Sequence, residues 1–110
     1  MTVVADMRGQ AEIVKFWAPW CGSCRLFAPV VSSVVDGSAG EMRLREVNLA
    51  EDTEEADARG VGTLPTLVVL KDGKELGRLI GAMSRTALTD QLSELLGGAD
   101  PSIDTATAKD

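Results

Sequence analysis

The order of apolar and polar positions along the chain predicts an alternation of strands and helices. Residues 13–17 form a short β-rich run with apolar side chains on both faces, which is typical of a central strand covered by helices on both sides. From residue 27 to residue 34, apolar side chains recur at the spacing of an amphipathic helix. Pro29 lies within this helix and should kink it, and the glycines of segment 37–40 should end it.

The next part of the pattern predicts a second strand and a short helix. Residues 42–49 alternate, imperfectly, between apolar and charged side chains, as expected of a strand. Residues 51–59 are acidic at the start and basic at the end, and this order favours a short helix through its dipole.

The last part of the pattern predicts a hairpin and a final helix. Residues 66–70 and 75–80 should be two strands that turn at Asp72 and Gly73. Ser84 should cap a helix that ends at the glycine pair 97–98. The apolar stripe of this helix consists of Leu88, Leu92, Leu95 and Leu96.

The order of these elements predicts an α/β fold in a single domain over residues 1–98, because no repeat or linker divides the chain. A helix links the first two strands, which should run parallel, whereas the last two form an antiparallel hairpin. We therefore expect a central mixed sheet of about four or five strands with helices on both faces. Residues 99–110 hold a single isoleucine among small and polar residues and are expected to be a disordered tail.

Composition narrows the class of protein. A chain of 110 residues that is 45% apolar and 25% charged fits one soluble domain. The formal net charge of −6 argues against nucleic acid or an anionic membrane as a partner. No apolar run approaches the roughly 18 residues that a membrane span needs. The first residues lack the basic and then apolar order of a secretory signal, so we expect a cytoplasmic protein.

Cys21 and Cys24 stand where the first strand passes into the first helix. A helix N-terminus presents unpaired N–H groups and the positive end of the helix dipole, and both stabilise a thiolate. Cys21 should therefore be an exposed nucleophile with a lowered pKa, and Cys24, one turn further on, is placed to attack a mixed disulfide. This arrangement predicts redox chemistry.

Other roles for the two cysteines are weaker alternatives. A structural disulfide is disfavoured in the cytosol, which keeps thiols reduced. A zinc or iron–sulfur site needs about four ligands, and a chain with two cysteines and no histidine could build one only by bridging two chains. We therefore expect no bound metal. The last alternative, two unpaired core cysteines, fits poorly with a strand–helix junction flanked by Trp20 and Gly22.

The sequence around the cysteines resembles the thioredoxin family. The resemblance rests on residues 16–24 (Phe-Trp-Ala-Pro-Trp-Cys-Gly-Ser-Cys), on Pro29, on residues 63–66 (Thr-Leu-Pro-Thr) and on the Gly-Ala pair 81–82. It extends over roughly residues 12–96. It implies the thioredoxin fold and a protein disulfide reductase in which one cysteine attacks a substrate disulfide and the other resolves the mixed disulfide.

The resemblance also implies the surroundings of the cysteines. Pro65 would be a catalytic-site residue in the cis form that faces them; an edge-strand proline opening the hairpin is the alternative. Trp17 would pack under the active site, although a plain core aromatic explains this residue equally well. An apolar groove would receive a substrate strand, and the residues implied for it are Trp20, Gly22, Ser23, Thr63, Leu64, Ile80, Gly81 and Ala82.

Partners and electron supply follow from the same resemblance. The family implies no bound cofactor, electrons from NADPH through a thioredoxin reductase, disulfide-containing proteins as substrates, and a monomer. A thioredoxin-like oxidant or isomerase is the nearest alternative, and a cytoplasmic location argues against it. A subunit that binds a partner without redox turnover is the other alternative.

Three features depart from the family pattern. Ser23 stands where most members have proline, and this should raise the entropic cost of closing the disulfide. The family's buried acid falls at Lys15 and its lysine at Glu46; we expect this reversed pair to lie behind Cys24 as catalytic residues, unless Lys15 merely snorkels to the sheet edge. With twenty residues before the first cysteine, the usual first helix should be missing, and residues 2–5 are a candidate edge strand beside residues 43–47.

Overall fold

The computed structural model describes residues 10–97, and within them strands and helices alternate in the predicted order. The elements are β1 (Ala11–Trp17), α2 (Gly22–Asp36), β2 (Met42–Asn48), α3 (Glu54–Arg59), β3 (Thr66–Lys71), β4 (Lys74–Ile80) and α4 (Arg85–Leu95). The expectations of a missing first helix, of an edge strand at residues 2–5 and of a tail at residues 99–110 fall outside the described residues.

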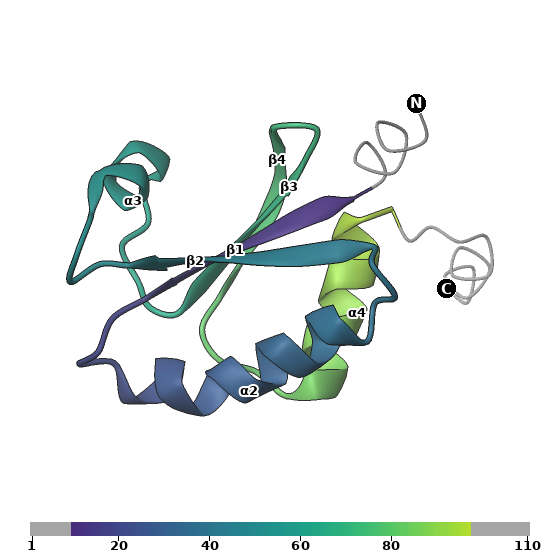
Figure 1. Ribbon diagram of the computed structural model, residues 1–110, viewed down its shortest axis with the longest axis horizontal. Helices are drawn as coiled ribbons and strands as arrows, with labels where there is room; N and C mark the ends of the chain where they lie inside the picture. Colours follow the sequence, from purple (N-terminus) through teal and green to yellow (C-terminus); the bar gives the residue numbers. More distant parts are fainter. Residues whose placement is uncertain (1–9, 98–110) are drawn as a thin grey trace, which may run out of the picture.

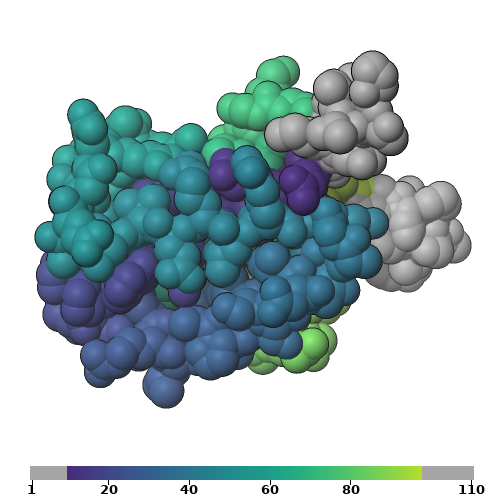
Figure 2. Space-filling view, viewed as in Figure 1, coloured from purple at the N-terminus to yellow at the C-terminus, as the bar shows by residue number. Residues whose placement is uncertain are grey.

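Four strands form one mixed sheet in the order β2-β1-β3-β4. β1 runs parallel to β2 and antiparallel to β3, and β3 runs antiparallel to β4, which confirms both predicted pairings. Asp72 and Gly73 at the hairpin turn have φ angles of 55° and 80°, the left-handed conformation that a two-residue type I′ turn requires. β1 and β3 are therefore the inner strands, and the space-filling view shows β2 at the surface between α2 and α3 (Figure 2).

Helices cover both faces of the sheet, as predicted (Figure 1). Successive side chains of a strand point to opposite faces, so each inner strand contributes to two separate apolar clusters. The cluster under α2 and α4 contains Ile13, Phe27, Val31, Val34, Val35, Leu67, Val69, Leu79, Leu88 and Leu92. The smaller cluster under α3 contains Val14, Phe16, Ala56, Val68 and Leu70.

The two long helices keep their predicted limits. α2 runs through Pro29 as one helix and ends at Gly37, whose N–H bonds to the carbonyl of Ser33 at 3.0 Å. In α4, the Ser84 hydroxyl accepts a hydrogen bond from the N–H of Ala87 at 3.1 Å, which confirms the predicted cap. The leucine stripe of α4 packs on the sheet, with its first two members buried and its last two partly buried.

α3 begins at Glu54, three residues later than predicted. Asn48 causes the difference, because its side chain accepts a hydrogen bond from the N–H of Ala50 at 2.9 Å and its carbonyl accepts one from Glu51 at 2.9 Å. The Asp52 carboxylate then bonds to the N–H of Glu54 at 2.9 Å. Side chains that bond to nearby backbone groups in this way favour turns over helix.

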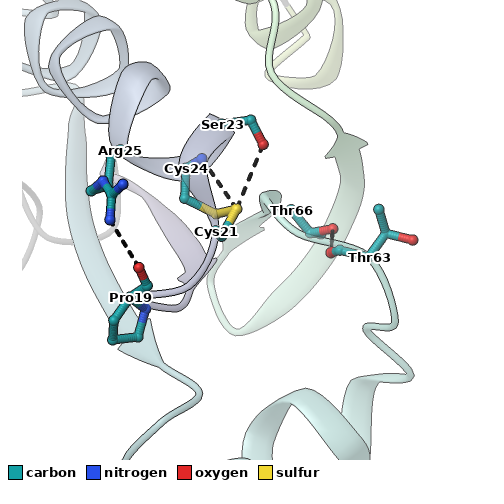
Figure 3. Close-up of a disulfide and its surroundings, with 7 residues drawn as sticks. All are labelled: Pro19, Cys21, Ser23, Cys24, Arg25, Thr63 and Thr66. Atoms are coloured by element: carbon teal, nitrogen blue, oxygen red, sulfur yellow. Dashed lines mark hydrogen bonds between the residues drawn. A yellow bond between two sulfur atoms is a disulfide. The ribbon is translucent and has the colours of Figure 1, made fainter.

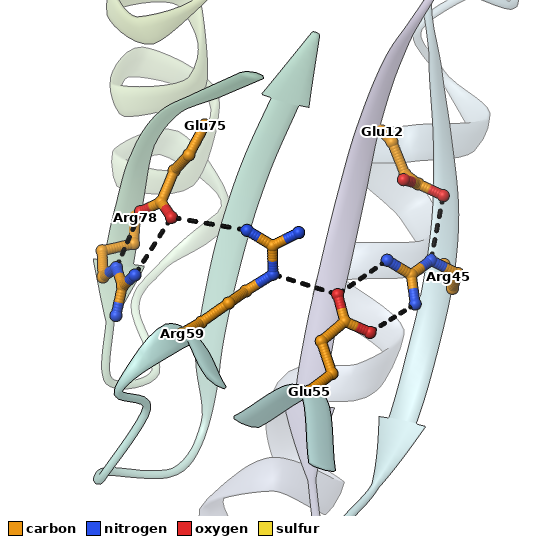
Figure 4. Close-up of polar contacts among 6 residues, drawn as sticks. All are labelled: Glu12, Arg45, Glu55, Arg59, Glu75 and Arg78. Atoms are coloured by element: carbon orange, nitrogen blue, oxygen red, sulfur yellow. Dashed lines mark hydrogen bonds and ion pairs between the residues drawn. The ribbon is translucent and has the colours of Figure 1, made fainter. Parts of the chain in front are cut away.

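A chain of ion pairs crosses the sheet on the face that carries α3 (Figure 4). The Glu55 carboxylate accepts two hydrogen bonds from Arg45 of β2, at 2.7 and 2.9 Å, and one from Arg59 at 3.0 Å. Arg45 also reaches Glu12 of β1 at 3.0 Å. Arg59 lies 3.6 Å from Glu75 of β4, which in turn pairs with Arg78 at 2.8 Å. Ala56 is the one buried residue of α3, so the helix is held largely by these charges. Glu55 and Arg59 attach it to β2 and β4, and Arg45 extends the chain of ion pairs to β1.

Candidate active site

Cys21 and Cys24 form a disulfide at the N-terminus of α2 (Figure 3). Cys21 is the N-cap residue, with its Cα 5.3 Å from that of Cys24. The N–H of Cys24 donates a hydrogen bond to Sγ of Cys21 at 3.1 Å, and the Ser23 hydroxyl lies 3.6 Å from the same sulfur. Cys21 is partly exposed whereas Cys24 is 2% exposed, so an external molecule reaches Cys21 first.

The loop between β1 and α2 fixes the position of Cys21. Its N–H bonds to the carbonyl of Ala18 at 3.0 Å and forms a tight turn after the strand. Arg25, one helical turn later, donates from Nη1 to the carbonyl of Pro19 at 3.0 Å. The disulfide is therefore held between a central strand and the first turn of a helix, as the sequence predicted.

Pro65 directly precedes β3, at the end of the sheet where β1 finishes. The Leu64–Pro65 peptide bond is cis, which confirms what the resemblance implied. β3, which follows Pro65, pairs with β1 on one side and β4 on the other, so the edge-strand alternative for this proline is wrong. The Thr66 hydroxyl donates to the carbonyl of Thr63 at 2.6 Å and closes the turn around the cis bond. That Pro65 takes part in catalysis stays a prediction.

The implied substrate groove comes from three separate segments of the chain. Strand register pairs Thr66 with Ile80, and the N–H of Gly81 bonds to the carbonyl of Pro65 at 2.8 Å, so two of these segments lie side by side. Trp20 is 70% exposed and Ile80 is 60% exposed. That these side chains bind substrate stays a prediction. The other predicted members are exposed (Gly22, Ser23, Thr63, Ala82) or half-buried (Leu64, Gly81).

Trp17 ends β1 and is half-buried, which fits both roles considered for it. Its indole Nε1 is buried and has no hydrogen-bond partner among the described residues.

Lys15 and Glu46 form the predicted ion pair. The parallel register of β1 and β2 sets the two residues opposite each other, with Lys15 Nζ 3.4 Å from Glu46 Oε2. Lys15 is 4% exposed and Glu46 is 46% exposed, so a buried ammonium pairs with a carboxylate on the surface of β2. Lys15 stands two positions after Ile13 in β1, so both side chains lie on the face that α2 covers. A catalytic role for the pair stays a prediction.

Sequence reasoning missed Arg25 as a neighbour of the disulfide. The signal was available, because a residue four positions after Cys21 lies one turn above it on the same face of a helix.

Within residues 10–97, no group of three or more potential metal ligands lies together. None of the helices in this range is long and apolar enough to cross a membrane.

Comparisons with known proteins agree with the geometry. The thioredoxin family model matches residues 2–94. Thioredoxin 1 of Nostoc sp. is 37% identical over 84 residues, which cover 76% of this chain and 78% of that protein. The chloroplastic M-type thioredoxin of Zea mays is 33% identical over 87 residues, covering 79% of this chain and 52% of that protein. In fold, the chain is similar to a solved structure of thioredoxin-2, a component of malaria parasite protein secretion machinery, with a TM-score of 0.72 at 22% identity over 77% of this chain and 82% of that one.

Proposed function

This chain belongs to the thioredoxin family and is a protein disulfide reductase, and from that premise we propose the roles of its residues. Cys21 is the nucleophile and Cys24 the resolving cysteine. The observation that carries this assignment is the difference in exposure between the two sulfur-bearing residues, one partly exposed at the helix terminus and the other 2% exposed behind it. Thiol–disulfide exchange needs an accessible attacking sulfur, and its rate depends on that access.

The reaction starts from the reduced pair. The Cys21 thiolate attacks one sulfur of a substrate disulfide; that S–S bond breaks, and the other substrate sulfur leaves as a thiolate. The Cys24 thiolate then attacks Sγ of Cys21, forms the intramolecular disulfide and releases the second substrate sulfur. The substrate gains the electron pair that the cysteine pair loses, and protons from solvent complete the substrate thiols.

The N-terminus of α2 favours the thiolate of Cys21. The N–H of Cys24 points at Sγ of Cys21 at 3.1 Å, and a hydrogen bond to a sulfur is stronger when that sulfur is charged. The dipole of a 15-residue helix adds to this effect at its first turn.

Substrate binding uses the exposed residues around the disulfide. Trp20 and Ile80 supply apolar surface, and the turn around Pro65, which lies next to Ile80, supplies backbone. Gly22, Ser23, Thr63, Leu64, Gly81 and Ala82 complete the surface against which an extended substrate segment packs.

Lys15 and Glu46 act on the resolving step. The buried ammonium of Lys15 lies on the face of β1 that α2 covers, and its positive charge favours the thiolate of Cys24. The Glu46 carboxylate, 3.4 Å from Nζ, pairs with this ammonium and offsets part of the cost of burying its charge.

Electrons reach the oxidised pair from NADPH through a thioredoxin reductase, and the protein itself binds no cofactor. We infer a cytoplasmic monomer with roles in electron transport and cell redox homeostasis. The family resemblance supports these assignments. Location is the first of them to test, because some relatives are named as chloroplastic proteins.

A coupled assay tests the function. Insulin, NADPH and a thioredoxin reductase are combined with the protein, and NADPH oxidation and insulin thiols are measured together. We expect turnover with the natural sequence and none with Cys21→Ser, Cys24→Ser or the double variant. Absence of turnover with the natural sequence, alongside partner binding that survives in the double variant, would support the non-redox alternative. Net oxidation of reduced substrates under the same conditions would support the oxidant.

A further inference from the structure

Arg25 borders the disulfide on the side away from the turn around Pro65. Its N–H bonds to the carbonyl of Cys21 at 3.4 Å, so it lies one helical turn above the nucleophile. Its guanidinium reaches back along the loop to the carbonyl of Pro19 at 3.0 Å. Figure 3 shows Arg25 and Pro19 on one side of the cysteine pair, with Thr63 and Thr66 on the other.

The charge of Arg25 is not neutralised by any carboxylate of the described residues. The ion pairs of residues 10–97 use Lys15, Arg43, Arg45, Arg59 and Arg78, and none includes Arg25. Arg25 is exposed, and the bond to Pro19 uses one N–H of a guanidinium that carries about five. Donors therefore remain free at the loop that precedes Cys21.

We propose that Arg25 is a specificity-determining residue that binds a carboxylate next to the substrate disulfide. The inference rests on the proposed function, because it concerns which disulfides the same cysteine pair reduces. A guanidinium forms strong, directed hydrogen bonds with carboxylates, and the Pro19 carbonyl restrains this one in place before substrate arrives. The net charge of −6 repels acidic proteins at long range, so the preference is confined to the residues beside the disulfide.

A simpler role for Arg25 predicts a different result. Its charge could act only on Cys21, by favouring the thiolate, and would then change the rate for every substrate by the same factor. A ratio of rates for two substrates cancels that factor, whereas recognition of a substrate carboxylate changes the ratio.

The test uses two disulfide-linked peptide substrates that differ at one position, with Asp or Lys next to a half-cystine. The reduced protein is mixed with each in a single turnover at low salt, and acid-quenched thiols give the two second-order rate constants. We expect the natural sequence to favour the Asp peptide. Arg25→Gln should lower the Asp-to-Lys ratio about two- to fivefold, the range for an exposed ion pair, and Arg25→Glu should lower it further. Arg25→Lys should retain most of the preference.

Lys74→Gln is the matched control. Lys74 is an exposed lysine outside the ion pairs of the described residues, and the hairpin places it at the opposite end of β3 from Pro65. It makes the same change in net charge and should leave the ratio unchanged. High salt, about 1 M, should reduce the preference of the natural sequence because it screens the exposed pair.

The outcomes separate this inference from the proposed function. An unchanged ratio in Arg25→Gln, with both peptides still reduced, would overturn the inference and leave the reductase function intact. An equal fall of the Asp-to-Lys ratio in Lys74→Gln would also overturn the inference, because the effect would then come from the net charge of the protein and not from Arg25. Failure of the natural sequence to reduce either peptide would contradict the reductase function itself.

Discussion

At the scale of single residues, Ser23 adjusts the balance between dithiol and disulfide. It is the second residue of α2, and its hydroxyl lies 3.6 Å from Sγ of Cys21. A hydroxyl that donates to this sulfur stabilises the reduced form, in which the sulfur is a thiolate. The flexible backbone at Ser23 also raises the entropic cost of closing the disulfide. Both effects make the reduction potential less negative.

Ser23→Pro should therefore make the potential more negative. Restricting the loop is worth roughly 0.4–1 kcal/mol, which corresponds to about 10–20 mV for a two-electron couple. Equilibration with glutathione buffers measures the shift. Ser23→Ala removes the hydroxyl without restricting the backbone, so comparing the two variants separates the two effects. A shift of Ser23→Pro to a less negative potential would contradict the entropic argument.

Lys15 and Glu46 are the second residue-scale feature that distinguishes this chain. Lys15→Asp, with Glu46 unchanged, would bring two carboxylates together and raise the pKa of one of them. We expect slower resolution of mixed disulfides near neutral pH and lower stability. Adding Glu46→Lys should recover much of the loss, with a coupling energy within roughly 0.5–3 kcal/mol.

Thermal melts and single-turnover resolution rates of the two single variants and the double variant measure this coupling. Lys15→Met is the control for packing, since it keeps the length of the side chain without its charge. Additive effects in the double variant would show that the residues do not interact, and Lys15 would then be a snorkelling side chain.

At the scale of elements, local signals predicted most of the fold. An apolar run on both faces predicted the first strand, and an imperfect alternation predicted the second. Asp72 and Gly73 predicted the hairpin turn, and Ser84 predicted the start of α4. The start of α3 was wrong because hydrogen bonds from Asn48 and Asp52 to nearby backbone groups form turns where charge order suggested helix.

The ion pairs on the α3 face could not be predicted from the sequence. Glu12 and Arg45 are 33 positions apart, and they meet only because β1 and β2 pair in one particular register. Within the site, the cysteines followed from the strand–helix junction, whereas the cis form of Pro65 came from family resemblance alone. The place of Arg25 one turn above Cys21 could have been predicted from helical spacing, but its hydrogen bond to the Pro19 carbonyl depends on the path of the loop and could not.

β4 and α4 meet closely at Gly77. A Cβ added to this residue would lie 2.6 Å from Cδ2 of Leu95, a distance that forces the leucine side chain to move. Because only the end of a half-buried leucine side chain has to move, Gly77→Ala should lower the free energy of unfolding by about 1 kcal/mol, the low end of overpacking costs. Urea denaturation measures the change.

A double variant checks that Leu95 is the cause. Leu95→Ala alone should destabilise by removing apolar contact, but in the Gly77→Ala background it should cost markedly less, because it also relieves the clash. Strictly additive losses would show that the alanine acts elsewhere.

At the scale of the whole molecule, the ion pairs of the α3 face link stability to pH. Hydrogen bonds from Arg45, with those from Arg59, lower the pKa of Glu55 to about 2 from 4.5, and Arg78 lowers that of Glu75. A carboxylate whose pKa is depressed by folding stabilises the fold above its unfolded pKa and loses that contribution as pH falls through the folded value. The loss from Glu55 should therefore develop between pH 4.5 and about 2.

Glu55→Gln should reveal this contribution. At neutral pH it should lower the free energy of unfolding by about 1–2 kcal/mol, a figure reduced for screening by water. The difference from the natural sequence should shrink as pH falls from 6 towards 2. Urea denaturation across this range measures it, and Glu94→Gln, an exposed carboxylate outside the described ion pairs, is the control. A difference that is independent of pH would contradict the assignment.

The sheet as a whole positions the site. The inner strands β1 and β3 bring the cysteine loop and Pro65 to one end of the sheet, and the hairpin turn lies at the other end.

The central claim is that Cys21 attacks the substrate and Cys24 resolves the intermediate. Trapping tests it most directly: reduced Cys24→Ser is mixed with a disulfide-linked peptide, and the product is digested and analysed by mass spectrometry. We predict a stable mixed disulfide between Cys21 and the peptide, and little or none with Cys24 in Cys21→Ser. Absence of the Cys21 adduct, or faster trapping through Cys24, would contradict the account.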